Sequence, residues 1–124
     1  RADVDIYVPC ALGGVITEKS AREIRARAVA GSANNQLASP RAGAVLAERN
    51  ILFAPDYVIN AGGIISGMVA ASRMPGRNNV PLRPLEESLA AIRDRLIQIF
   101  SRAAAEGVPP EVTAEQLARE LIGR

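Results

Sequence analysis

Three short segments of the chain are rich in small side chains, a composition that lets a ligand come close to the backbone, and two of them also carry side-chain amides. The segments are residues 9–14 (PCALGG), 31–36 (GSANNQ) and 60–63 (NAGG). Asparagine and glutamine amides both donate and accept hydrogen bonds, so they suit a carboxamide or a carboxylate of a ligand. A structural explanation stays open for each segment, because small residues also form tight turns and asparagines cap helices.

Short apolar runs and helical patterns alternate around these segments and predict an α/β protein with a parallel sheet. The strand candidates are residues 5–9, read as a buried strand ended by proline, 28–30 and 52–54, with a further apolar run at 57–60. The helix candidates are residues 17–24, 40–49 and 64–71, the second with Ser39 as N-cap and Pro40 in its first turn. Ligands bind at the carboxyl ends of parallel strands. Three successive small-residue segments in that position favour a ligand site over simple turns.

The second half of the chain predicts two helices after an irregular segment at residues 73–83. A helix from Pro84 carries one apolar stripe at alternating spacings of four and three, and Gly107 ends it. The stripe is formed by Leu85, Leu89, Ile92, Leu96, Ile99 or Phe100, and Ala103. Thr113, with Gln116 three residues later, predicts the start of the last helix through a capping box. We expect three side chains of that helix to face the core, Leu117, Leu121 and Ile122.

The composition excludes several kinds of chemistry within these residues. The chain of 124 residues has no histidine and one cysteine, Cys10. Disulfides, zinc sites built from several Cys or His ligands, and histidine-dependent nucleophilic catalysis are therefore excluded. Without a histidine partner, Cys10 is interpreted as a buried or cofactor-contacting thiol rather than as a nucleophile.

The charge pattern argues against nucleic-acid and membrane partners. Fifteen basic and thirteen acidic residues alternate along the helical stretches, and Lys19 is the only lysine. A basic face interleaved with aromatic residues, as nucleic-acid binding requires, is not found. No apolar run approaches the roughly 20 residues of a membrane span. We expect a cytoplasmic protein.

The glycine patterns do not match a phosphate-binding turn. Gly62 and Gly63 precede a helix, but this pair is too short a motif to form the dinucleotide-binding fingerprint. The acidic residue that the fingerprint requires about 20 residues further along the chain is also missing. The predicted sheet therefore looks like a cofactor-binding sheet without its pyrophosphate-binding turn.

The sequence resembles the glutamate/leucine/phenylalanine/valine dehydrogenase family in three motifs. They are DIYVPCALGGVI (residues 5–16), AGSANNQL (residues 30–37) and APDYVINAGG (residues 54–63), and the second resembles the leucine/phenylalanine/valine branch. The resemblance implies the C-terminal half of a Rossmann-like doubly wound sheet followed by two closing helices. Residues 1–72 would form the second half of an NAD-binding domain, and residues 84–124 would pack on it.

The resemblance also implies an activity and the roles of five cofactor-binding residues. Family members oxidatively deaminate an L-amino acid to its 2-oxo acid and reduce NAD. By position, Cys10 and Ala11 would contact the adenosine side, and Ala33 and Asn35 would lie near the nicotinamide ribose. Asn60 would bind the nicotinamide carboxamide and fix which ring face meets the substrate.

Three positions are implied for the substrate. Asn35 would reach its carboxylate, and Ile64 and Gly67 would line the pocket for its side chain. Gly67 is smaller than the branched residue usual in leucine enzymes, so we expect a pocket with room for a bulkier substrate.

The resemblance places the family's catalytic lysine and aspartate in an N-terminal domain outside these residues. Lys19 is expected on the surface, so we expect no catalysis by this chain alone. If residues 4–8 normally pair with a strand outside these residues, this chain alone leaves that sheet edge unpaired. We therefore expect a homo-oligomer that covers the edge. The alternative is a non-catalytic nucleotide-binding or assembly module on the same scaffold.

Overall fold

The computed structural model describes residues 3–74 and 84–123, so most of the predicted irregular segment lies outside the described residues. Three parallel strands form one small sheet in the order β1 (Ile6–Tyr7), β2 (Ala28–Val29) and β3 (Leu52–Phe53). Helix α1 (Glu18–Glu23) connects the first two strands, and α2 (Pro40–Glu48) connects the second pair. The predicted alternation of strands and helices in a parallel sheet is confirmed.

Both connecting helices begin at side-chain caps, of which the sequence analysis predicted the one at α2. Thr17 and Ser20 form a reciprocal capping box at α1, with the Ser20 N–H donating to Thr17 Oγ1 at 3.1 Å. Ser39 accepts a hydrogen bond from the Ala42 N–H at the start of α2. Arg49, at the end of α2, donates to the carbonyls of residues 21 and 24 and so ties α2 to the end of α1.

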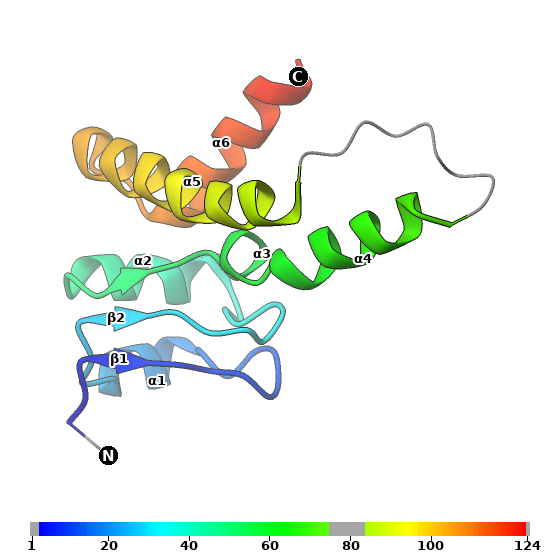
Figure 1. Cartoon of the computed structure of the whole chain (residues 1–124). Coiled ribbons are helices and arrows are strands. Elements are labelled where there is room, and N and C mark those ends of the chain that lie inside the picture. Colours follow the sequence, from blue (N-terminus) through cyan, green and yellow to red (C-terminus); the bar gives the residue numbers. More distant parts are fainter. Residues whose placement is uncertain (1–2, 75–83, 124) are drawn as a thin grey trace.

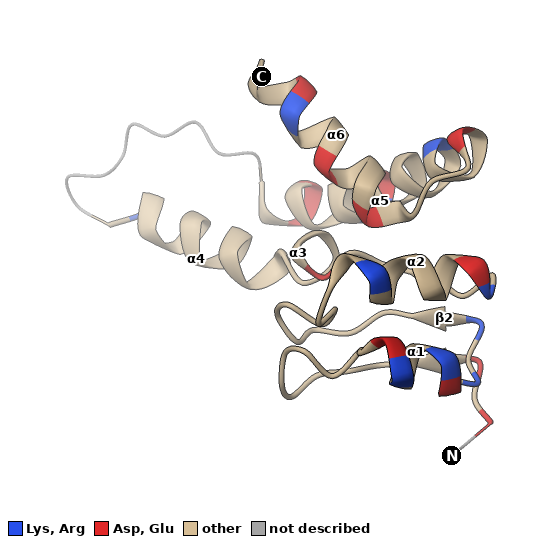
Figure 2. Cartoon of the chain, turned by 180° about the vertical axis from the view of Figure 1, so that it is seen from behind, with Lys and Arg blue, Asp and Glu red and all other residues tan. Residues whose placement is uncertain are grey.

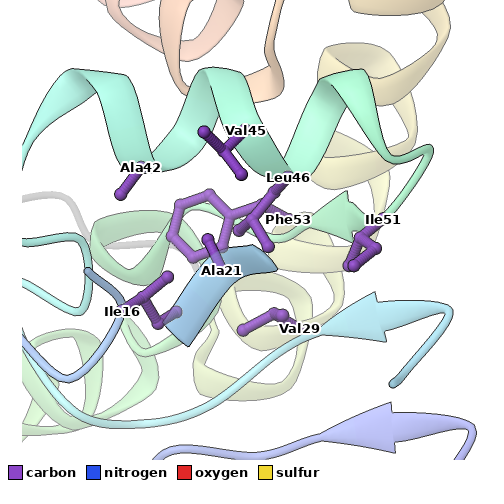
Figure 3. Packing of buried hydrophobic residues seen from close by; sticks show 8 residues of the cluster. All are labelled: Ile16, Ala21, Val29, Ala42, Val45, Leu46, Ile51 and Phe53. Atoms are coloured by element: carbon purple, nitrogen blue, oxygen red, sulfur yellow. The ribbon is translucent and has the colours of Figure 1, made fainter. Parts of the chain in front are cut away.

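The main hydrophobic core lies between the sheet and these two helices. Figures 1 and 2, which are opposite views, show α1 and α2 on the same face of the sheet. The ring of Phe53 lies among side chains from both helices and from β2 (Figure 3). The buried members of this core are Ile16, Ala21, Val29, Ala42, Val45, Leu46, Ile51 and Phe53.

The first strand is exposed, so the prediction of a buried strand is wrong. Ile6 is 53% and Tyr7 37% exposed, and their neighbours Val4 and Val8 are exposed as well. β1 pairs with β2 on one side, and no described element pairs with its other side. Within residues 3–74 and 84–123, this strand is therefore an open sheet edge.

Residues 57–60 are helical, although their apolar pattern resembles that of the preceding strand. They belong to α3 (Asp56–Ile59) and its C-cap Asn60, and α4 (Gly62–Ser72) follows, two residues earlier than predicted. Pro55 has φ −55° at the N-cap, and the Asp56 carboxylate lies in the first turn, where a helix favours negative charge. These two residues start a helical turn that the apolar pattern alone does not indicate.

The last two helices pack on each other beside β3. α5 (Leu85–Glu106) ends at Gly107 in the left-handed conformation, as predicted, with φ 67°. α6 (Pro110–Ile122) starts earlier than predicted, and Thr113 is buried within it instead of capping it. Proline fits the first helical turn, so Pro110 moves the start upstream of the capping-box pattern.

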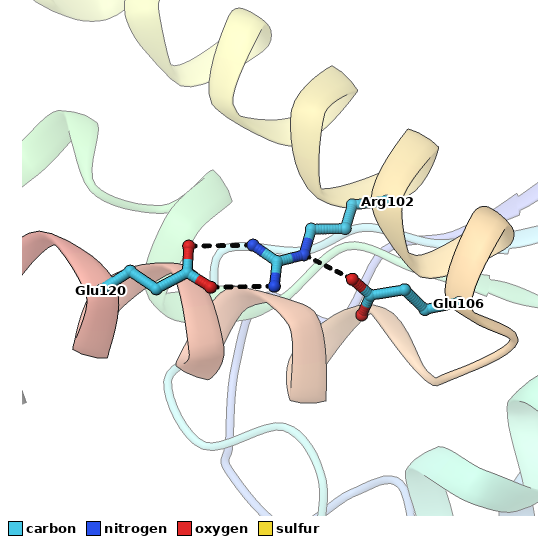
Figure 4. A network of polar contacts seen from close by, with 3 residues as sticks. All are labelled: Arg102, Glu106 and Glu120. Atoms are coloured by element: carbon cyan, nitrogen blue, oxygen red, sulfur yellow. Dashed lines mark hydrogen bonds and ion pairs between the residues drawn. The ribbon is translucent and has the colours of Figure 1, made fainter.

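Arg102 joins α5 to α6 (Figure 4). It binds both carboxylate oxygens of Glu120 at 2.9 Å and Glu106 at 2.7 Å.

Of the three residues expected to point inward from the last helix, only Leu117 is buried, while Leu121 and Ile122 are 69% and 67% exposed. The described structure holds no helix that is both long and apolar enough to cross a membrane.

Candidate functional site at the carboxyl end of the sheet

The loops that follow β1 and β2 pack backbone against backbone. The Ala33 N–H donates to the Pro9 carbonyl at 3.0 Å, and the Gly14 N–H donates to the Asn35 carbonyl at 2.7 Å. A Cβ atom on Gly31 would lie 2.0 Å from the Pro9 oxygen, and one on Gly13 would lie 2.7 Å from the Asn34 oxygen. These glycines are therefore required by the contact between the loops, whatever else binds there.

Asn60 joins the third segment to the second. Its Nδ2 donates to Asn34 Oδ1 at 2.6 Å and to the Ser32 carbonyl at 3.3 Å. Residue 60 follows the single turn of α3 instead of a strand, and this turn brings its amide against the loop after β2. The structure thus brings Asn60 together with residues 31–36.

Cys10 lies at the same end of the sheet and is exposed, so the alternative of a buried thiol is wrong. Hydrogen bonds from the side chain and the backbone of Ser32 lower the pKa of the Cys10 thiol, because they favour the thiolate. Ala11, the next predicted contact, is also exposed. Ser32 thus contacts both Cys10 and Asn60.

Ala33 and Asn35 differ in what they can offer to a ligand. Ala33 is 5% exposed, its N–H binds Pro9, and its carbonyl accepts from Gln36 Nε2 at 3.0 Å. It therefore has little surface for a ligand. Asn35 is exposed and has φ 52°, a left-handed conformation that asparagine tolerates better than most residues. Its backbone N–H donates to Asp56 Oδ2 at 2.8 Å.

Four further residues support the site: Ser32, Asn34 and Gln36, which were predicted only as members of the segment 31–36, and Asp56, which was not predicted. Ser32 and Asn34 accept from Asn60, and Asp56 holds the N–H of Asn35. Gln36 is fully buried and donates from Nε2 to the carbonyls of residues 31 and 33. A polar residue next to an apolar run is the only sequence signal that Asp56 gave.

The two predicted substrate residues lie on α4, beyond Asn60. Ile64 is 71% exposed, and a Cβ atom on Gly67 would meet nothing within 4 Å. Residues spaced by three or four lie on one side of a helix, so Ile64, Gly67 and the half-exposed Met68 form an exposed apolar face.

The donor set is neutral and suits a ligand that carries amide or hydroxyl groups. None of the residues in the segments 9–14, 31–36 and 60–63 is charged. The exposed groups are amides, a hydroxyl and a thiol, which match a carboxamide and ribose hydroxyls. A pyrophosphate has no basic partner in these segments.

Comparison with known proteins identifies relatives along nearly the whole chain. The profile of the Glutamate/Leucine/Phenylalanine/Valine dehydrogenase family matches residues 1–119. A leucine dehydrogenase of Thermoactinomyces intermedius is 38% identical and a valine dehydrogenase of Streptomyces albus 41% identical, each over 97% of this chain. The chain spans 31% of the length of each of these relatives.

Solved structures show the same relationship. The crystal structure of L-tryptophan dehydrogenase from Nostoc punctiforme aligns with a TM-score of 0.85 and 36% identity over 98% of this chain and 35% of its own. A hetero-hexameric glutamate dehydrogenase from Thermus thermophilus aligns with a TM-score of 0.67 and 26% identity over 94% of this chain and 28% of its own. By sequence profile, relatives and fold, the chain belongs to the Glutamate/Leucine/Phenylalanine/Valine dehydrogenase family.

Proposed function

We propose that this chain is the C-terminal, NAD-binding portion of an amino-acid dehydrogenase, with residues 1–72 as the second half of a Rossmann-like domain. The observation that carries the proposal is the cluster of neutral hydrogen-bonding groups around Ser32, Asn34 and Asn60, at the carboxyl end of a parallel sheet. Its composition suits a nicotinamide riboside, and the chain's relatives are named as dehydrogenases.

Each site residue has a proposed task. Asn60 binds the nicotinamide carboxamide, Asn35 reaches the ribose and the substrate carboxylate, and Ala33 supports that loop from beneath. Cys10 and Ala11 contact the adenosine side. NAD, when bound, accepts the hydride from the α-carbon of an L-amino acid as the amine is oxidised; this chain's residues bind and orient it.

We further propose that these 124 residues bind NAD without turning over substrate. The resemblance places the catalytic lysine and aspartate in an N-terminal domain. Lys19 is exposed on α1, as expected, and we propose that it does not replace that lysine. The complete enzyme is proposed to be cytoplasmic and homo-oligomeric, and in the isolated chain self-association would cover the open edge of β1.

The test combines NAD binding with an activity assay. We expect saturable binding of NAD by the chain in calorimetry, loss of most of the affinity in Asn60→Ala, and no NAD reduction with branched-chain or aromatic L-amino acids. Gln116→Ala is the matched control, because it removes an exposed amide on α6. Absence of binding at millimolar NAD would favour the non-catalytic assembly module. Turnover by the chain would contradict the proposal that catalysis requires the lysine and aspartate of the N-terminal domain.

Gly67 sets the proposed substrate class, a bulky or aromatic L-amino acid. The L-tryptophan dehydrogenase with a similar fold supports this assignment. A Cβ atom at residue 67 meets nothing within 4 Å in this chain, so we expect Gly67→Val in the complete enzyme to narrow the space for the substrate side chain. We expect kcat/KM for tryptophan or phenylalanine to fall about tenfold relative to that for valine. A shift in favour of the larger substrates would contradict the assignment.

A further inference from the structure

Helix α3 is fastened to the loop after β2 at both of its ends. Its first residue, Asp56, accepts a hydrogen bond from the Asn35 N–H, and its C-cap, Asn60, donates to Ser32 and Asn34. The two ends are one helical turn apart, so a short rigid element spans residues 32–35 of the loop.

The Asp56 end of this connection is protected from water. Asp56 is 7% exposed, and its Oδ2 lies 2.8 Å from the Asn35 nitrogen. A hydrogen bond to a carboxylate is stronger than one between neutral groups. The bond holds Asn35 in the left-handed conformation, which a free loop residue would leave readily.

The Asn60 end determines which amide atom remains for a ligand. Because Nδ2 already donates to Ser32 and Asn34, Oδ1 is the atom of this side chain left to act as an acceptor. An acceptor at this point pairs with the NH₂ group of a carboxamide.

We propose that α3 is a two-ended clamp and that Asp56 is a positioning residue, which holds residues 32–35 in the conformation that receives the dinucleotide. The inference rests on the proposed function for its ligand, whereas the clamp itself is a property of the chain alone. Asp56 acts through the Asn35 backbone and does not contact the dinucleotide.

The test compares Asp56→Ala, Asp56→Asn and the control Asp94→Ala, an exposed aspartate on α5. Asp56→Ala leaves the Asn35 N–H without its partner, so we expect about tenfold faster hydrogen exchange at residues 32–35, with the amides of α2 unchanged. Asp56→Asn keeps an acceptor oxygen and should restore exchange to within about threefold of the original rate. Asp94→Ala should have no effect at the loop.

NAD titration of the same variants links the clamp to binding. We expect the dissociation constant to rise about tenfold in Asp56→Ala and to recover most of that loss in Asp56→Asn. Unchanged loop exchange in Asp56→Ala, or faster exchange throughout the sheet, overturns the clamp. Unchanged affinity in Asp56→Ala, when the original chain binds NAD, overturns the positioning role. If the original chain does not bind NAD, the proposed function and the positioning role fail together, while the exchange result still decides the clamp.

Discussion

Helices α2 and α4 follow neighbouring site loops but use their apolar residues in opposite ways. Four residues of α2 are buried, and three of them, Ala42, Val45 and Leu46, lie in the core between the sheet and α1. α4 carries no charged residue within its bounds and yet buries none of its residues. Apolarity in α2 stabilises the fold, whereas in α4 it forms an exposed face, which is the arrangement expected of a binding surface.

The difference follows from how each helix is connected. α2 lies between two strands of the sheet, so its apolar face must cover β2 and β3 (Figure 1). α4 comes after the last strand and extends away from the sheet, with its inner side against α5. Substitutions that are matched between the two helices test this contrast.

The largest expected effect is the loss of core volume in α2. Leu46→Ala should lower the free energy of unfolding by about 2–5 kcal/mol, because Leu46 is fully buried. Met68→Ala in α4 should change it by no more than about 0.5 kcal/mol, because Met68 is 52% exposed. Chemical denaturation measures both. Equal losses in the two variants would show that α4 also belongs to the core.

Two glycines should respond in opposite directions to the same substitution. Gly31→Ala forces a Cβ atom against the Pro9 backbone, so we expect a loss of about 1–3 kcal/mol and displaced site loops. Gly67→Ala, inside α4 with open space around it, should raise stability by about 0.5–1 kcal/mol through its higher helix propensity. Thermal unfolding distinguishes the two signs, and a stable Gly31→Ala variant would contradict the described loop contact.

The smallest expected effect is a pH dependence at α6. Burial raises the pKa of Glu111, whose carboxylate lies against Gly43 of α2. The folded protein then binds this proton more tightly than the unfolded chain, so stability falls as the pH rises from about 4.5 through the raised pKa. Glu111→Gln should remove that fall and be the more stable form at neutral pH.

Glu120, on the exposed side of the same helix, provides a control of opposite sign. Its hydrogen bonds with Arg102 lower its pKa, so its contribution is present above about pH 4.5 and is lost as the pH falls through the lowered value. Glu120→Gln should therefore be less stable than the original chain at neutral pH and equal to it in acid. Unfolding curves from pH 3 to 8 compare the two variants, and slopes of the same sign would refute the assignment.

Local signals predicted the parts of the fold that local interactions determine. Ser39 and Pro40 start α2 as expected, and Gly107 ends α5. The same kind of signal failed at Thr113, because Pro110 offers an earlier start for the helix. Capping patterns identify a helix more reliably than they identify its first residue.

The site was predictable as three segments but not as a network. The alternation of strands and loops indicates that residues 9–14 and 31–36 lie at one end of the sheet. The bond between the Asn35 N–H and Asp56 joins residues 21 positions apart, and no periodicity or local motif carries that information. Resemblance to a family identified Asn60, but its partner Asn34 emerged only from the structure.

Chemical-shift mapping with NAD tests whether residues 31–36 and Asn60 bind the dinucleotide. The ¹⁵N-labelled chain is titrated with NAD, and the amides of residues 31–36 and Asn60 are followed beside those of α1 and α6 as internal references. We expect saturable shifts at residues 31–36 and at Asn60, with little change in the reference helices. No shifts at millimolar NAD, or shifts confined to the reference helices, would contradict it.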